Sequence, residues 1–193
     1  AAVTRGIVVM YALLLASSAW CFFRWNHASG VAALVVTLTL GLMYEEFFCE
    51  EFLDRNPVWV AITHQAIIFP LSVFVCCVAN PDAYSEPRTY YFAMTMLGSM
   101  LTYEVWRKLD PRAHACLGTY LVAYGPGGVF AMVAVATALA VGGAWGMMHE
   151  LNQMWPAYMI APAPVGVLVA LALLFLAGSP GKSHQWVELL SIL

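Results

Sequence analysis

Six continuous apolar stretches make up most of this 193-residue chain, and each is about as long as a lipid bilayer is thick. They cover residues 5–26, 30–48, 58–79, 89–106, 119–148 and 157–178. A hydrocarbon core of about 30 Å needs about 20 helical residues to cross it. None of the stretches alternates with period two, so the sequence predicts helices and not the strands of a barrel. We therefore expect an all-α, multi-pass membrane helix bundle with about six transmembrane helices.

The composition agrees with a single domain inside the membrane. Hydrophobic residues make up 62% of the chain and charged residues only 10%. The loops between the stretches are short, so residues 1–193 are interpreted as one transmembrane domain, with part of a further helix at the C-terminus. The net charge of −3 gives no reason to expect nucleic acid as a partner.

The basic residues predict the orientation. If the helices alternate in direction, six basic residues fall on one side of the membrane and two on the other. The first side carries Arg5, Arg55, Arg107, Lys108, Arg112 and Lys182, and the second carries Arg24 and Arg88. Basic loops stay in the cytoplasm. We expect the first side to face the cytoplasm, or the matrix or stroma of an organelle.

The first charged cluster follows the second stretch and holds five carboxylates within residues 45–54. On a continuous helix Glu46, Glu50 and Asp54 fall on one face. Such an acidic face could hold Mg²⁺, which binds carboxylates together with water and substrate phosphates. The alternative is a helix end at the membrane interface whose acids are solvated and whose Phe47, Phe48 and Phe52 are buried.

The second charged cluster, Glu104, Arg107, Lys108 and Asp110, lies on the same predicted side. Glu104 and Lys108 are spaced i,i+4, so they can neutralise each other on one helix. In the other interpretation, Arg107 and Lys108 bind a diphosphate or an anionic head group while Glu104 and Asp110 bind a metal.

His64 and Gln65 are polar residues inside the third apolar stretch. Intramembrane polar residues often mark function. We expect His64 to hydrogen-bond to a neighbouring helix and not to bind a haem. The other histidines lie at stretch ends or loops, where they cannot complete a bis-histidine haem site. A haem or quinone cytochrome subunit would depend on His64 alone. Pro70 predicts a kink in the same stretch.

The segment from Tyr103 to Gly125 reads YEVWRKLDPRAHACLGTYLVAYG. It resembles the second-motif region of UbiA-type intramembrane prenyltransferases, which in one branch runs approximately E-x-x-R-K-x-R-x-P-E-[DE]-E and then T-Y-S-x-x-x-G. Residues 42–48, 56–57 and 63–65 are similar to the middle helices of that branch. Residues 3–8 and 182–193 are similar to segments near its two ends.

The resemblance implies nine helices around a cavity, with two acidic motifs that hold Mg²⁺ and the diphosphate of a polyprenyl donor. The acceptor, an aromatic or another lipid, attacks the allylic carbon. The first aspartate-rich motif is missing from this chain, and Arg112 and His114 stand where the second motif has acids. Only Glu104, Arg107, Lys108 and Asp110 carry over.

These departures leave two main hypotheses. The first is a UbiA-like membrane subunit without catalysis, with a scaffold or lipid- or quinone-binding role in a larger membrane complex. The second is an active Mg²⁺-dependent prenyltransferase whose first motif lies outside this chain. Mg²⁺ is expected as a cofactor only in the second case. In both, the partners are membrane lipids, including isoprenoids or quinones.

Overall fold

The computed structural model describes residues 2–108, 120–152, 166 and 169. All secondary structure in these residues is helical, as the apolar stretches predict. The long helices are α1 (Ala2–Arg24), α2 (His27–Tyr44), α4 (Pro57–Gln65), α5 (Ile68–Ala79), α6 (Pro87–Arg107) and α7 (Tyr120–Glu150). Three short helices join them: η1 (Glu46–Phe48), α3 (Glu50–Arg55) and η2 (Pro81–Ser85).

Within the described residues, four segments are long and apolar enough to cross a membrane. They are Gly6–Arg24, His27–Tyr44, Pro57–Ala79 and Gly127–Glu150. They match four of the six predicted stretches, so a multi-pass membrane protein is supported. The stretch at 89–106 forms α6, which has 21 residues but is not among these four. All of the stretch at 157–178 except residues 166 and 169 lies outside the described residues.

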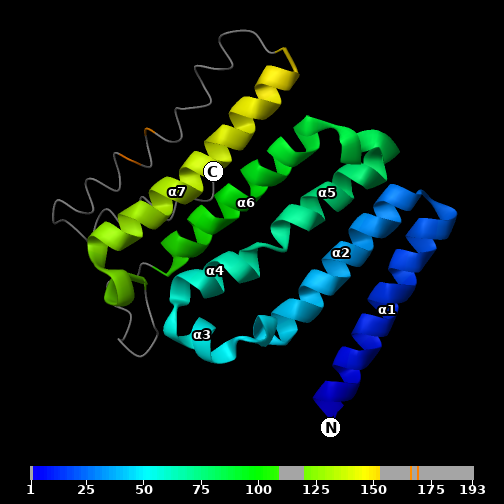
Figure 1. The fold of residues 1–193 in the computed structure, drawn as a ribbon, viewed down its shortest axis with the longest axis horizontal. Coiled ribbons are helices and arrows are strands. Elements are labelled where there is room, and N and C mark those ends of the chain that lie inside the picture. The colour runs from blue at the N-terminus through cyan, green and yellow to red at the C-terminus, as the bar shows by residue number, and fades with distance from the viewer. Residues whose placement is uncertain (1, 109–119, 153–165, 167–168, 170–193) are drawn as a thin grey trace.

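The described helices stand side by side in a row, in the order α1, α2, α4–α5, α6 and α7 (Figure 1). Each helix packs on its neighbours in the row, and α6 with α7 forms the most extensive contact. Much apolar surface therefore stays open, and Val8, Leu13 and Val135 are each more than 60% exposed. Lipid tails are the natural solvent for such a surface.

Successive helices run in opposite directions, so their ends alternate between the two ends of the row (Figure 1). The end of α2, the helices η1 and α3, the end of α6 and the start of α7 share one end, which we name the charged end. The loop between α1 and α2 and the helix η2 share the other end. Both charged clusters therefore lie at the charged end, on elements far apart in sequence.

Glycines let α6 and α7 approach closely. A Cβ placed on Gly98 of α6 would collide with the backbone of Ala136 and Ala140 on α7. A Cβ on Gly143 of α7 would lie 2.5 Å from the Tyr91 carbonyl oxygen. Small residues at such positions are typical of helix pairs in membranes.

The third span is broken where Pro70 predicts a kink. α4 ends at Gln65 and α5 begins at Ile68. Pro70 has no N–H to donate to the Ala66 carbonyl, so the Phe69 N–H donates to that oxygen instead, at 3.2 Å. The predicted kink is confirmed, and it divides one span into two helices.

Polar side chains fix the end of the row opposite the charged end. Asn26 caps α2 by accepting from the Ser29 N–H at 2.6 Å, and its amide donates to the Cys77 carbonyl of α5. Asn80 donates to Glu86, which also pairs with Arg88. This end is therefore held by hydrogen bonds that cross between helices.

Candidate functional site

The candidate site lies at the charged end, around the last turn of α6. Lys108 Nζ lies 2.8 Å from Glu104 Oε1, one helical turn earlier. The Glu104 side chain is only 11% exposed and that of Lys108 is 35% exposed. The i,i+4 spacing predicts this pair, and the structure shows it formed and largely removed from solvent.

The start of α7 covers the pair. Lys108 Nζ lies 5.3 Å from the centre of the Tyr120 ring, within the range of a cation–π contact. Tyr120 is fully buried, and it packs in a cluster with Val105 and Trp106 of α6. The other buried members of that cluster are Ala61, Val129 and Val133.

The surroundings of Lys108 favour its charged form. Burial by itself lowers the pKa of a lysine. The hydrogen bond to the Glu104 carboxylate and the contacts with Tyr120 outweigh burial and raise the pKa of Lys108 above its ordinary value. The ammonium group is therefore a fixed positive charge, matched by the carboxylate of its own helix.

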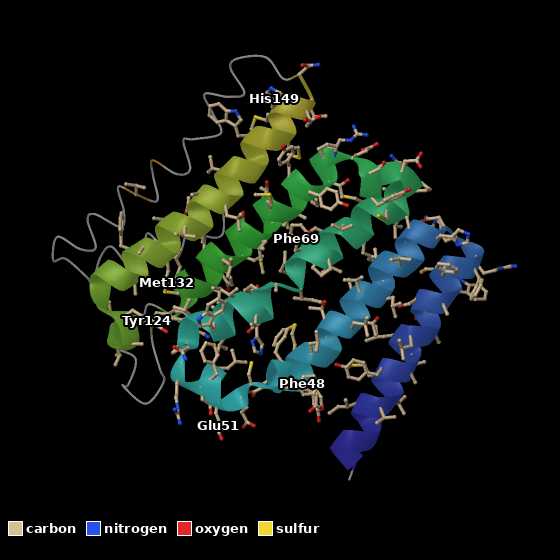
Figure 2. The ribbon with its side chains drawn as sticks, in the orientation of Figure 1. Phe48, Glu51, Phe69, Tyr124, Met132 and His149 are labelled. Carbon is tan, nitrogen blue, oxygen red and sulfur yellow. The ribbon has the colours of Figure 1, made fainter. Side chains whose placement is uncertain are left out.

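A glycine turn brings α7 onto α4. Gly125 has φ 65°, in the left-handed region that glycine tolerates, and it breaks the helical path between Tyr120–Tyr124 and the rest of α7. The turn places Tyr124 beside α4, where its hydroxyl accepts from the Val58 N–H at 3.3 Å. Tyr124 is labelled at this corner in Figure 2. The first turn of α4 and the start of α7 are thus joined directly.

An apolar cavity of about 320 Å³ lies between α4, α6 and α7. Its lining residues include Val58, Ile62, Val105 and Met132. Neither Glu104 nor Lys108 lines it. The charged pair and the cavity therefore both involve α6, but the pair lies outside the lining of this cavity.

The first charged cluster does not form the continuous helix that the sequence predicts. Glu46, Phe47 and Phe48 have φ of 46°, 54° and 59°, so η1 turns in the left-handed sense before α3 begins at Glu50. The expectation that Glu46 shares a helical face with Glu50 and Asp54 is therefore wrong. Left-handed backbone costs about 1–2 kcal/mol per non-glycine residue, and no glycine or asparagine in this segment signals it.

Four of the five acids of this first cluster are exposed, and Glu46 is half-buried. A groove of about 730 Å³ at the charged end is lined by Glu45, Phe48, Cys49, Glu50, Glu51, Phe52 and Arg55. Of the predicted acidic face, only Glu50 lines it, and both Glu50 and Asp54 are exposed. Figure 2 shows Phe48 and Glu51 on this outer edge. The exposed acids agree with the alternative interpretation, but its expectation that Phe48 and Phe52 are buried is wrong, because they are 79% and 50% exposed.

The residues that the structure describes do not fit a magnesium site. No three of their histidine, cysteine, aspartate or glutamate side chains come together closely enough to hold a metal. Glu104, the predicted metal ligand, is bound to Lys108. Asp110, the side chain of Arg107 and the residues up to 119 lie outside the description, so their predicted roles stay predictions.

His64 bonds within its own helix. Its Nδ1 lies 2.9 Å from the Val60 carbonyl oxygen, which can only accept, so the ring donates to the turn before it. The expected bond to a neighbouring helix is therefore wrong. Gln65 is half-buried and ends α4.

The sequence predicts no contact for two tyrosines of the site. Tyr120 lies in the segment that resembles the second motif, but its burial against Lys108 depends on how α7 packs onto α6. The bond of Tyr124 to α4 spans 66 residues and leaves no local signal. The adjacent Gly125-Pro126-Gly127-Gly128 sequence is the only local signal that the chain turns near Tyr124.

No protein-family profile, no curated protein and no solved structure matches this chain.

Proposed function

We propose that the chain is a UbiA-like integral membrane subunit that does not transfer prenyl groups and that binds lipids or quinones within a larger membrane complex. The observation that carries this proposal is the pairing of Lys108 with Glu104. A diphosphate site needs cations that face an open pocket and acids that are free to hold a metal. Here one cation and one acid of the motif-like segment, Lys108 and Glu104, pair with each other.

The placement of charge supports the proposed orientation. The backbone positions of Arg5, Arg55, Arg107 and Lys108 lie on elements at the charged end, and those of Arg24 and Arg88 at the opposite end (Figure 1). With six spans, the charged end faces the cytoplasm, matrix or stroma, as basic loops do. The proposal includes α6 as the fourth span and residues 157–178 as the sixth.

One observation favours the alternative, an active prenyltransferase. Both charged clusters lie at the same end of the row, where an enzyme of this family would hold its donor (Figure 1). In that case Mg²⁺ would be needed. The further acids that hold it would come from residues other than those that the structure describes, or from outside this chain.

A transfer assay separates the two proposals. The purified chain is incubated in detergent with Mg²⁺, geranylgeranyl diphosphate and an aromatic acceptor, and diphosphate release is measured. We expect release at the level of a protein-free sample. Steady release that Glu104→Gln abolishes would overturn the non-catalytic proposal and favour the enzyme.

A further inference from the structure

A second apolar site lies at the end of the row away from Lys108. A groove of about 520 Å³ opens between α2, α5, η2 and the start of α6. We name it the α2–α5 groove. Its lining residues include His27, Val31 and Val35 of α2, Val73 of α5, and Tyr84 and Tyr90.

The groove runs from the membrane boundary into the span. His27 is the first residue of α2, and Val35 lies about 12 Å further along the helix at 1.5 Å per residue. Phe69 and Pro70 begin α5 just after the break in the third span. Val31, Val35 and Val73 give the groove aliphatic surface, and rings come from His27 at the start of α2, Phe69 of α5, Tyr84 of η2 and Tyr90 near the start of α6.

Two polar side chains of the groove, Tyr90 and His27, can accept hydrogen bonds from a ligand. Tyr90 Oη donates its proton to the Tyr84 carbonyl at 2.6 Å, so its lone pairs remain to accept. His27 Nδ1 lies 3.1 Å from the Phe22 carbonyl oxygen and must donate to it. In the neutral imidazole the other nitrogen, Nε2, is then an acceptor. The Tyr84 hydroxyl can donate or accept, so it can bond equally to a ligand that donates and to one that accepts.

Aromatic contacts hold these groups in place. The His27 ring packs on Phe22 with 4.5 Å between centroids. The rings of Tyr90 and Phe69 lie 6.4 Å apart and tilted by 30°. Figure 2 labels Phe69 at the start of α5. The groove therefore offers an aromatic wall, acceptors at its mouth and an apolar floor.

We propose that the α2–α5 groove binds a hydroquinone-headed lipid, with its hydroxyls toward His27 and Tyr90 and its apolar tail along Val31, Val35 and Val73. This inference rests on the lipid- or quinone-binding role proposed above and names its ligand class. The two hydroxyls of a hydroquinone donate to the two acceptors, and its ring matches the aromatic wall. The oxidised quinone has only acceptors and leaves His27 Nε2 and Tyr90 Oη unpaired. A phospholipid phosphate fails for the same reason.

The test compares the two redox forms of one ligand. The purified chain is placed in phosphatidylcholine nanodiscs and titrated with decylubiquinol, kept reduced, or with decylubiquinone, and binding is followed by calorimetry. We expect saturable binding of the quinol and at least about tenfold weaker binding of the quinone, the effect of losing one good hydrogen bond. Equal binding of the two forms would overturn the proposal.

Two variants and one control locate the site. Val73→Trp fills the groove and should abolish quinol binding, whereas Val75→Trp, on the lipid-facing side of the same helix and 54% exposed in the native chain, should leave it unchanged. His27→Phe keeps an aromatic ring at this position but removes the acceptor nitrogen. It should reduce the preference for the quinol while the groove stays open. Quinol binding that survives Val73→Trp in a protein with native circular dichroism would overturn the proposal. This readout is independent of prenyl transfer, so the failure of either proposal can be recognised alone.

Discussion

The two charged clusters lie at the same end of the molecule but accommodate their charges in different ways. Glu104 and Lys108 are held against Tyr120 by packed helices, and each charge has a partner. The acids of η1 and α3 stand on an exposed edge, where water can solvate them. The comparison indicates that helix packing, and not charge density, decides which charges become part of the folded structure.

The close contact of α6 with α7 should be the strongest determinant of the paired cluster. Gly98→Val would force a side chain into the backbone of Ala136 and Ala140, and we expect it to destabilise the protein by about 3 kcal/mol. Unfolding in detergent micelles, followed by circular dichroism, measures the effect.

Gly142→Ala is the matched control, since a Cβ at Gly142 meets nothing within 4 Å. It should change stability by less than about 1 kcal/mol. If Gly98→Val were equally mild, the close approach of the two helices would not support the pair.

Breaking the buried pair should cost less than separating the helices, but more than any change in the exposed cluster. Glu104→Gln leaves the Lys108 ammonium partly buried without its carboxylate, at a cost of about 1–3 kcal/mol after allowance for the exposure of Lys108. Glu50→Gln, on the exposed edge, should stay within about 0.5 kcal/mol.

The double variant Glu104→Gln/Lys108→Met removes both charges, and it should recover at least half of the loss caused by Glu104→Gln alone. Equal costs for Glu104→Gln and Glu50→Gln would contradict the comparison between the clusters.

The smallest predicted effect is the dependence of the free energy of unfolding on pH. The folded protein raises the pKa of Lys108, so this residue contributes stability that is fully present below its unfolded value of about 10.4. That contribution is lost as pH rises through the higher folded value. Above about pH 10 the free energy of unfolding should therefore fall more steeply in the native chain than in Lys108→Met. Parallel curves for the two proteins would show that Lys108 titrates alike when folded and unfolded.

Features encoded locally could be predicted from the sequence. The length of the apolar stretches gives the helices, the lack of an N–H in Pro70 gives the break, and the i,i+4 spacing gives the Glu104–Lys108 pair. Features that depend on distant partners could not. Glu46 and Phe47 carry no signal for a left-handed turn.

The site also depends on a distant partner. Tyr120 reaches Lys108 only because α7 packs back onto α6 after an intervening segment. Hydropathy also says nothing of the order in which helices stand beside one another, so the open row could not be derived from the lengths of the stretches.

The break at Ala66 and Ile67 gives the third span two sets of neighbours. α4 packs on α3, α6 and α7, whereas α5 packs on α2, η2 and α6. The joint therefore lies between the charged end, which contains the Glu104–Lys108 pair, and the end that contains the α2–α5 groove. Pro70, which causes the joint, also lines that groove. A molecule seated there would contact the residue at which the helix is interrupted.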